Sequence, residues 1–308
     1  MKTAIIGTGA MGSVYAGLLG AAGHEVWAVD RWRAHLDAIA ENGLRLEGAS
    51  GDRTVALRTS ETGAEVGTAE LVIIATKAMH IESAAEAAAG MVGPDTTVLA
   101  IQNGLGSAEK VADRIGADRV AIGVVGGFGA SIVAPGHAHH NGWELVRLGE
   151  MNGPVTPRLE AIAEVWRSGG FKVRTFDDIH QMVWEKLICN VCYSGTCAIS
   201  ERTIAEVQAN PHLWQVASGC ATEAYQVARA KDIALEFDDP VAYVRAFGEK
   251  IPNARPSMLL DRQAGRRAEI GAINGAIPPL ARPLGIPTPY NDTVVALIRG
   301  YEQYLPEA

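Results

Sequence analysis

Two polar side chains, Lys186 and Asn190, stand four residues apart in a stretch that is otherwise almost entirely apolar. This spacing places both on one face of a helix, with Val183, Trp184 and Ile188 around them. An ammonium group beside an amide can bind and polarise a carboxylate or a carbonyl group. The alternative is a lysine that extends its charge to the edge of the core, beside a hydrogen-bonded core asparagine.

A second polar set, Ser257, Asp261 and Glu269, has spacings of four and eight residues. The pattern predicts a helix over residues 257–275, ended by the pair Pro278-Pro279, with all three side chains on one broad face. One face that carries a hydroxyl and two carboxylates is a candidate functional site. A helix-capping serine with two solvated acids explains the same residues without any chemistry.

The chain starts with a short apolar run and then has glycines in the spacing Gly-x-Gly-x-x-Gly. The first glycine permits a sharp turn, the second lets the backbone approach a pyrophosphate, and the third lets the next helix pack closely on the strand. The N–H groups at the start of that helix attract an anion. We therefore predict a dinucleotide site rather than a plain helix start. Its residues are Gly7, Thr8, Gly9, Ala10, Met11 and Gly12.

Two further segments fit the same site. Asp30 ends the next strand-like run, eighteen residues after Gly12, where an acid commonly binds the ribose hydroxyls. The pair Asn103-Gly104 follows the apolar run 97–101. In a doubly wound sheet, ligands bind beside the loops at such strand ends. An Asn-Gly pair is equally common in simple turns.

The elements that must position these residues follow from the alternation of strand-like and helical segments in the first half of the chain. It predicts an α/β fold with a doubly wound, Rossmann-type parallel sheet. From Asp177 the pattern is helical almost throughout. We expect a dinucleotide-binding domain at residues 1–176 and an all-α substrate and catalytic domain at residues 177–308. The expected strands are 4–6, 25–29, 71–75, 97–101, 120–124, 145–148 and 172–175, and the expected helices include 157–168, 204–208, 213–230, 240–251 and 257–275.

Composition narrows the possible partners. The 308 residues carry a formal net charge of −8, which disfavours a nucleic-acid surface. We find no apolar run of the roughly 18 residues that a membrane span needs, so we expect a cytoplasmic protein with a small-molecule partner and no membrane. Four cysteines gather in one region, and reduced core thiols are favoured over a zinc site, which needs a second ligand pair. They are Cys189, Cys192, Cys197 and Cys220.

Taken in order, these motifs resemble those of the ketopantoate reductase (2-dehydropantoate 2-reductase) family from one end of the chain to the other. The glycine motif of that family stands here at residues 7–12, its Asn-Gly loop at Asn103-Gly104 and its Lys-x-x-x-Asn helix at Lys186–Asn190. Its Ser-Met-x-x-Asp…Glu…Asn-Gly signature corresponds to Ser257-Met258, Asp261, Glu269 and Asn274-Gly275.

The resemblance implies an oxidoreductase that reduces a 2-oxo acid to a 2-hydroxy acid with a nicotinamide cofactor. The first expectation is ketopantoate to pantoate, in pantothenate and coenzyme A supply, by a homodimer. Lys186 would be the general acid, and Glu269 would orient it or hold a substrate hydroxyl. Asn103 would contact both cofactor and substrate. The other expected substrate-binding residues are Asn190, Ser194, Ser257 and Asp261.

The chain departs from the family pattern at Ser194, at Ala268 and in residues 126–131. These departures leave the substrate open, and another branched or aromatic 2-oxo acid is the first alternative. A non-catalytic dinucleotide-binding regulator is the second, although the retention of a lysine in apolar surroundings argues against it.

The choice of cofactor is open as well. Asp30 favours NAD(H), because a carboxylate accepts hydrogen bonds from a free 2′-hydroxyl and repels a 2′-phosphate. Arg31 and Lys77 stand at positions that resemble the phosphate ligands of the family, and they favour NADP(H) through charge-assisted hydrogen bonds. The family resemblance makes NADP(H) the expected cofactor.

Overall fold

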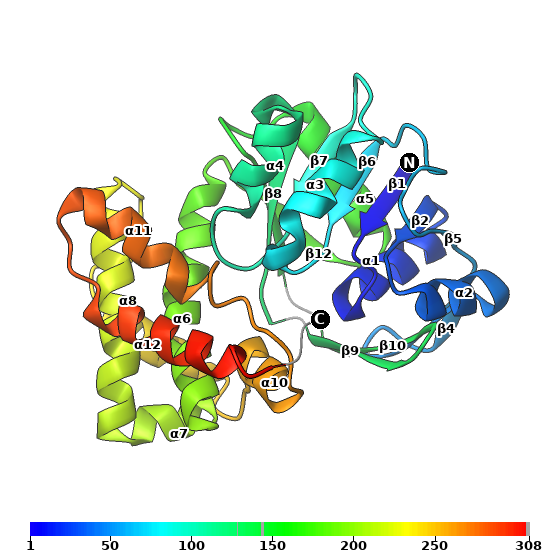
Figure 1. The fold of residues 1–308 in the computed structure, drawn as a ribbon. Coiled ribbons are helices and arrows are strands. Elements are labelled where there is room, and N and C mark those ends of the chain that lie inside the picture. The colour runs from blue at the N-terminus through cyan, green and yellow to red at the C-terminus, as the bar shows by residue number, and fades with distance from the viewer. Residues whose placement is uncertain (128, 143–144, 306–308) are drawn as a thin grey trace. The chain divides into compact units, whose positions relative to one another are not determined.

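The computed structural model describes residues 1–127, 129–142 and 145–305. The chain forms two compact units, drawn in Figure 1. The first consists of residues 1–102 and 107–179, and the second of residues 103–106 and 180–308. The first unit is a mixed α/β structure and the second is helical, which confirms the predicted fold class. The domain border expected between residues 176 and 177 stays a prediction.

An eight-stranded sheet forms the centre of the first unit, in the order β12-β11-β8-β7-β6-β1-β2-β5. Neighbouring strands run parallel except β8 and β11 (Leu145–Glu150), which are antiparallel. The prediction of an entirely parallel sheet is therefore wrong for this strand. No crossover helix joins β8 to β11 among the described elements, and only a parallel connection requires one. The other strands are β1 (Lys2–Ile6), β2 (Glu25–Val29), β5 (Arg58–Ser60), β6 (Leu71–Ile74), β7 (Thr97–Ala100), β8 (Val120–Val125) and β12 (Lys172–Thr175).

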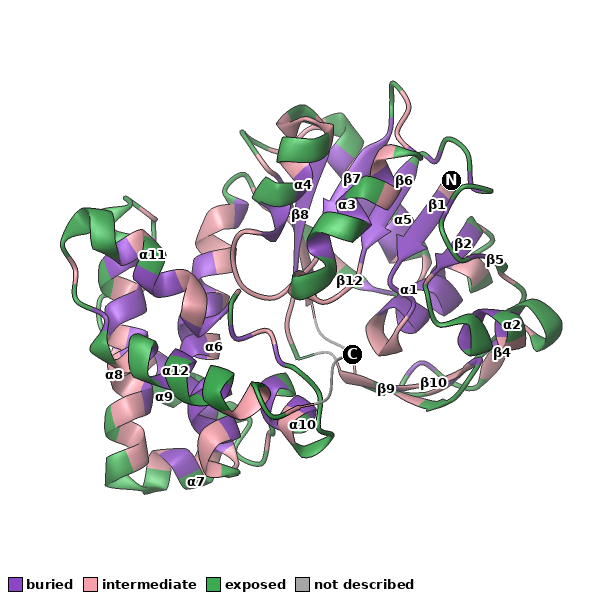
Figure 2. Cartoon of the chain, in the orientation of Figure 1, coloured by how far each residue is buried: buried purple, intermediate pink, exposed green. Residues whose placement is uncertain are grey.

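Helices cover both faces of this sheet. Helices α3 (Ile81–Ala89) and α4 (Ser107–Ile115) pack beside each other on one face. Helices α1 (Ala10–Ala21) and α5 (Pro157–Ser168) contact each other on the opposite face, and α2 (Arg33–Asn42) packs beside β5. Figure 2 shows that the central strands are buried. Strands buried on both faces have continuous apolar sequences, which explains why the predicted strands of this sheet are confirmed.

A second sheet of four strands, in the order β4-β3-β10-β9, was not predicted. It contacts α1, so this helix lies between the two sheets. The close packing requires small residues on α1: a Cβ added to Gly17 would lie 3.2 Å from the Leu46 side chain. Its strands have three to six residues and are partly polar, so even the alternation of Leu44-Arg45-Leu46-Glu47 is too short to be a clear strand signal. They are β3 (Leu44–Gly48), β4 (Arg53–Val55), β9 (Gly129–Ala134) and β10 (His137–Gly142).

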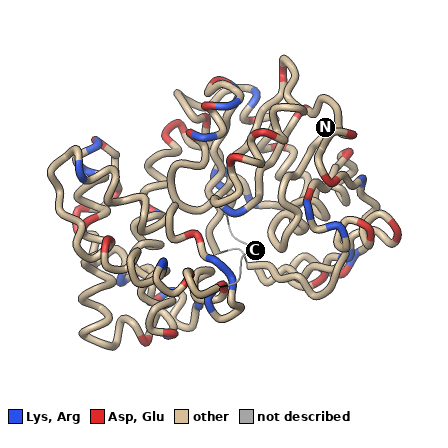
Figure 3. Tube along the Cα trace, in the orientation of Figure 1, with Lys and Arg blue, Asp and Glu red and all other residues tan. Residues whose placement is uncertain are grey.

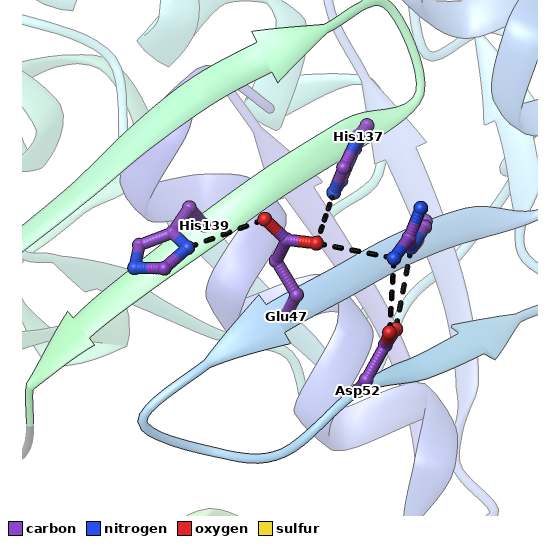
Figure 4. A network of polar contacts seen from close by, with 5 residues as sticks. Glu47, Asp52, His137 and His139 are labelled. Atoms are coloured by element: carbon purple, nitrogen blue, oxygen red, sulfur yellow. Dashed lines mark hydrogen bonds and ion pairs between the residues drawn. The ribbon is translucent and has the colours of Figure 1, made fainter.

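A network of charged groups joins β3 to β10 on the small sheet (Figure 4). Glu47 Oε2 lies 3.0 Å from His137 Nε2, and Glu47 Oε1 lies 3.4 Å from His139 Nδ1. Arg45 contacts Glu47 at 3.2 Å and Asp52 at 2.9 Å. Hydrogen bonds from His139 and His137 lower the pKa of Glu47. This side of the small sheet is thus held by polar contacts in place of a hydrophobic core.

The helical unit surrounds α6 (Ile179–Ser200), whose residues 191–198 are all buried. The helices predicted at 204–208, 213–230 and 240–251 are confirmed, with ends that differ by a few residues. Side chains at their first turns explain where they begin: Thr203 and Glu206 form a capping box. The described helices after α6 are α7 (Ile204–Ala209), α8 (Pro211–Ala230), α9 (Pro240–Lys250), α10 (Ser257–Gln263), α11 (Ile277–Ala281) and α12 (Pro289–Glu302).

A buried polar network fixes α12 in this unit. Glu223 of α8 accepts the backbone N–H groups of Tyr290 at 2.8 Å and Asn291 at 2.9 Å, at the start of α12. Burial raises the pKa of Glu223, and the bonds from Asn291 and Tyr290 oppose the rise. Asn274 donates to Asn291 Oδ1 at 3.0 Å and to the carbonyl of Val191 at 2.9 Å. Asn274 therefore connects α6 with α12 and has a structural role.

The four cysteines are buried free thiols on α6 and α8. Within the described ranges no group of three or more His, Cys, Asp or Glu residues could hold a metal ion. Acidic and basic residues are interspersed along both units, as Figure 3 shows. None of the helices that the structure describes is both long and apolar enough to cross a lipid bilayer.

The thiols should be almost inert in the folded protein. Burial raises the pKa of Cys189 to about 12 and that of Cys197 to about 12, so at pH 8 roughly one such thiol in ten thousand is the reactive thiolate. We expect a chromogenic disulfide reagent to label none of the four within minutes in native protein and all four after unfolding in guanidinium. Native labelling at the rate of unfolded protein would contradict this burial.

Candidate active site

The glycine turn after β1 is built by two close approaches of the backbone. Gly7 has φ of +93°, and a Cβ there would lie 2.6 Å from the backbone nitrogen of Thr76. A Cβ on Gly12 would lie 2.0 Å from the carbonyl oxygen of Gly7. Neither position accepts a side chain, whatever binds nearby. Gly7 and Gly12 therefore hold the strand, the turn and α1 together, as the motif predicts.

Gly9 differs, because a Cβ added to it would meet nothing within 4 Å. Packing within the protein therefore does not require glycine at position 9. The absence of a side chain there leaves space that a ligand can fill. Gly9 is also the residue before α1, whose start has no side-chain cap and no acidic residue in its first turn. Uncapped N–H groups beside open space fit the pyrophosphate of a dinucleotide. Thr8 is buried, and Ala10 and Met11, which open α1, are half-buried.

The residues expected to bind the adenosine end follow strands next to β1. Strands β2 and β6 flank β1 and run parallel to it, so their carboxyl ends lie at one edge of the sheet. Asp30 follows β2 and is half-buried, and its Oδ1 accepts the backbone N–H of Trp32 at 3.0 Å. Arg31 is exposed, whereas Lys77, beyond β6, is half-buried. The sheet thus gathers an acid and two cations at the same edge as the glycine turn.

In the helical unit, Lys186 and Asn103 are in direct contact. Lys186 Nζ donates to Asn103 Oδ1 at 2.7 Å, although the residues are 83 positions apart. Both side chains are half-buried. Asn190 lies one turn further along the continuous helix α6, on the face of Lys186, and is also half-buried, and Ser194 one turn beyond it is buried. The predicted lysine face therefore exists, and it carries a fixed ammonium group.

The loop 103–106 is held against the segment that carries Glu269. Leu105 N donates to the carbonyl oxygen of Ala272 at 2.9 Å. A Cβ on Gly104, which has φ of +87°, would lie 2.0 Å from that same oxygen, so glycine is required there. The N–H of Ala272 in turn donates to the carbonyl of Glu269 at 3.1 Å. These bonds bring the backbone of Glu269 next to the loop of Asn103, although both lie outside regular helices.

The predicted helix over residues 257–275 is wrong. Helix α10 ends at Gln263, Gly265 has φ of +65°, and residues 266–269 have no regular structure. The side chain of Arg266 turns back to Asp261 Oδ1 at 3.1 Å, which closes the helix end. The pair Pro278-Pro279 lies in the first turns of α11 instead of ending a helix, where a proline is tolerated.

This correction separates the predicted acidic face. Ser257 is exposed at the start of α10, and Asp261 is buried and paired with Arg266. Glu269 is half-buried beyond the end of that helix. The three residues therefore do not share one helix face. The assignment of Ser257 and Asp261 to substrate binding stays a prediction without that support.

Three residues without a predicted role shape these sites. Gln102 Nε2 donates to the carbonyl of Ile74 at 2.6 Å and of Thr76 at 3.3 Å, at the end of β6. Ser13 and His35 are buried and form hydrogen bonds next to the glycine turn. The signal available for His35 is its place beside Leu36 and Ile39, which are buried with it on α2.

The chain matches two family models. Residues 3–153 match the model described as Ketopantoate reductase PanE/ApbA. Residues 178–302 match the model described as Ketopantoate reductase PanE/ApbA C terminal. Together the two matches cover most of both structural units.

Individual relatives extend over nearly the whole chain. A 2-dehydropantoate 2-reductase of Archaeoglobus fulgidus is 33% identical over 304 residues, which is 99% of each chain. The crystal structure of a PanE/ApbA family ketopantoate reductase from Ralstonia eutropha JMP134 has a TM-score of 0.90 and 33% identity, and covers 98% of this chain and 99% of its own. The structure of D-mandelate dehydrogenase with NADH and anilino(oxo)acetate has a TM-score of 0.89 and 28% identity, with 98% and 99% covered.

Alanine at two of the glycines should separate ligand binding from folding. Gly9→Ala has room in the protein and an extended backbone, so its melting temperature should stay within about 2 °C of the wild type, while affinity for NADH and NADPH falls about tenfold or more. Gly12→Ala should destabilise the fold by at least about 2 kcal/mol, because its methyl group overlaps a backbone oxygen. Thermal melts and calorimetric titration measure both. Unchanged cofactor affinity in a folded Gly9→Ala protein would contradict the site.

Proposed function

Because the chain belongs to the ketopantoate reductase family, we propose that it reduces 2-dehydropantoate (ketopantoate) to pantoate with a reduced nicotinamide cofactor. The family consists of NAD(P)H-dependent oxidoreductases. The observation that carries the proposal is the contact of Lys186 Nζ with Asn103 Oδ1 at 2.7 Å. It fixes an ammonium group on a helix that is otherwise mostly apolar, and reduction of a ketone needs a proton donor of this kind.

Lys186 acts as the general acid in this proposal. The reduced nicotinamide supplies a hydride to the ketone carbon, and negative charge then develops on the ketone oxygen. The ammonium group of Lys186 stabilises that charge and donates the proton that completes the hydroxyl group. Its neutral amine regains a proton from water after the product leaves.

Asn103 positions the acid. Its Oδ1 accepts from Lys186 Nζ, so its amide nitrogen is the end that can donate to a substrate carboxylate or to the nicotinamide amide. The backbone of Asn103 is fixed by the turn at Gly104 and by the hydrogen bond from Leu105 N to the carbonyl oxygen of Ala272. A fixed donor and a fixed acid together give the reacting geometry.

The remaining proposed roles depend on place in the fold. Asn190 and Ser194 continue the face of Lys186 along α6 and would contact the substrate. Glu269 would orient Lys186 or hold a substrate hydroxyl, which its half-buried place beside the loop 103–106 permits. Ser257 and Asp261 complete the proposed substrate set, although Asp261 already binds Arg266.

A different 2-oxo acid is the second candidate. The structure of D-mandelate dehydrogenase with NADH is similar to 99% of this chain at a TM-score of 0.90, and mandelate is an aromatic 2-hydroxy acid. Ser194 and Ala268 depart from the family pattern, and both are buried beside residues of the proposed site. Phe128, in another departing segment, lies outside the described residues. A branched or aromatic acid therefore stays in the proposal as the alternative to ketopantoate.

A non-catalytic dinucleotide-binding regulator is the third candidate, and a fixed Lys186 argues against it, since a binding module needs no proton donor. A cytoplasmic homodimer that supplies pantothenate synthesis remains an expectation of the family. For the cofactor we propose NADP(H), because exposed Arg31 and half-buried Lys77 share the sheet edge of Asp30. NADH, which D-mandelate dehydrogenase binds, is the alternative that Asp30 supports.

The function is tested by loss of reduced-nicotinamide absorbance with ketopantoate and a panel of branched and aromatic 2-oxo acids. We expect turnover of ketopantoate, and Lys186→Ala should lower kcat by about 100- to 10,000-fold. Cofactor affinity should change less than about threefold. Lys250→Ala, at an exposed helix end of the same unit, is the control and should match the wild type. Turnover only of other acids would replace the substrate, and no loss in Lys186→Ala would remove its role.

Cofactor choice is tested at Asp30. Asp30→Ala removes a charge that repels a 2′-phosphate and an acceptor that binds a 2′-hydroxyl, so NADPH affinity should rise relative to NADH affinity by about tenfold. Asp30→Asn keeps an oxygen for the Trp32 N–H and removes only the charge. It should shift the ratio in the same direction in calorimetric titrations. An equal change for both cofactors would show that Asp30 does not read the 2′-position.

A further inference from the structure

A chain of three hydrogen bonds runs from the small sheet to the glycine turn. His35 on α2 is completely buried, and its Nδ1 accepts the backbone N–H of Gly136 at 3.0 Å. Its Nε2 lies 3.1 Å from Ser13 Oγ. Ser13 Oγ donates to the carbonyl oxygen of Thr8 at 3.0 Å. This series of hydrogen bonds thus ends on the peptide group that joins Thr8 to Gly9.

The direction of each bond follows from the neighbours. Nδ1 accepts, so a neutral imidazole carries its proton on Nε2. The Ser13 hydroxyl gives its only proton to Thr8, and it can therefore only accept from Nε2. Burial lowers the pKa of His35, opposed by the charge of Asp30, and this keeps the ring neutral. With the proton of His35 on Nε2, every donor in this series of hydrogen bonds has an acceptor.

The last bond determines where Gly9 points its N–H group. In a trans peptide the C=O and the following N–H point in opposite directions. Because Ser13 holds the Thr8 oxygen toward the core, the Gly9 N–H faces away from it. Gly9 is the position where an added Cβ meets nothing within 4 Å. Space for a ligand therefore exists beside Gly9, whose N–H faces away from the Ser13 hydroxyl.

His35 is itself held on two sides. The indole ring of Trp32 stacks on the imidazole, with ring centres 4.7 Å apart and planes at 12°. Gly136 has φ of +71° and lies in the turn between β9 and β10, where a Cβ would come within 2.9 Å of the Ala38 side chain. The hairpin of the small sheet is thus pressed against α2 beside His35. These contacts give the imidazole one orientation.

We propose that His35 is a positioning residue for the cofactor: through Ser13 it aims the Gly9 N–H at the pyrophosphate, and the small sheet braces it. The proposal rests on the proposed function only in assuming that a dinucleotide binds at the glycine turn. His35 makes no contact with the cofactor. It also gives the second sheet a part in cofactor binding.

A purely structural histidine would support the fold and affect all ligands alike. A residue that aims one N–H affects only ligands that carry the pyrophosphate. ADP-ribose contains the pyrophosphate and adenosine contains no phosphate, so the ratio of their affinities separates the two roles. The ratio is independent of the 2-oxo acid and of turnover.

Two variants of similar size divide the functions of the ring. In His35→Gln, the amide nitrogen takes the place of Nε2 and can still donate to Ser13. In His35→Asn, the amide oxygen takes the place of Nδ1 and can still accept from Gly136, but the side chain is too short to reach Ser13. We expect His35→Gln to bind ADP-ribose within about threefold of the wild type, and His35→Asn to bind it about tenfold more weakly.

Adenosine affinity should change less than about twofold in both variants, measured by calorimetric competition. Ser13→Ala removes the donor to Thr8 and should reproduce the loss of His35→Asn. The double variant should lose no more than the larger single loss, because both changes break one chain. Ser13→Ala also keeps the test decisive where His35→Asn does not fold.

Equal loss of adenosine and ADP-ribose, or wild-type ADP-ribose affinity in both His35→Asn and Ser13→Ala, would overturn the proposal and leave the proposed function intact. If the wild-type protein binds neither ADP-ribose nor NADPH nor NADH, the proposed function is overturned, and so is the positioning role of His35. Additive losses in the double variant would show that Ser13 and His35 act separately, which also contradicts the chain.

Discussion

The close approach of Gly12 to the Gly7 carbonyl is the constraint on which the first unit depends. The space for a side chain is absent, since a Cβ would lie 2.0 Å from that oxygen. The contact fixes where α1 starts relative to β1, and α1 in turn separates the two sheets. Both the direction of the helix N-terminus and the reach of Ser13 to Thr8 follow from it. One backbone contact thus positions both the proposed anion site and the residues that support it.

Local patterns predicted those parts of the protein that a single element can specify. The glycine turn needs only β1 and α1, and the lysine face needs only α6, so both were found from spacing alone. The helix over 257–275 failed because its apolar periodicity continues past Gly265, while the actual end is set by Arg266 returning to Asp261. The direction of strand β11 was predicted wrongly for a related reason. Strand direction depends on how the chain connects neighbouring strands, and the sequence of the strand itself does not indicate it.

The small sheet and His35 were missed together, and the cause is the same. Strands β3 and β10 are far apart in the sequence. β3 alternates buried leucines with polar residues over only five positions, and β10 is rich in histidine, so neither segment is long or apolar enough to predict a strand. The partners of His35, Ser13 and Gly136, lie 22 and 101 positions away. Sequence reasoning from neighbouring residues has no access to such pairs. They are also the contacts that orient the predicted binding turn.

Two consecutive residues show how the chain links its two sets of functional groups. The Gln102 side chain binds the backbone at the end of β6, within the first unit. The next side chain, Asn103, binds Lys186 within the second. One peptide bond therefore joins a residue at the sheet edge of the proposed dinucleotide site to a residue that holds the proposed acid. The two side chains are therefore coupled through the backbone that they share, since a shift of the peptide bond between them would displace both Gln102 and Asn103.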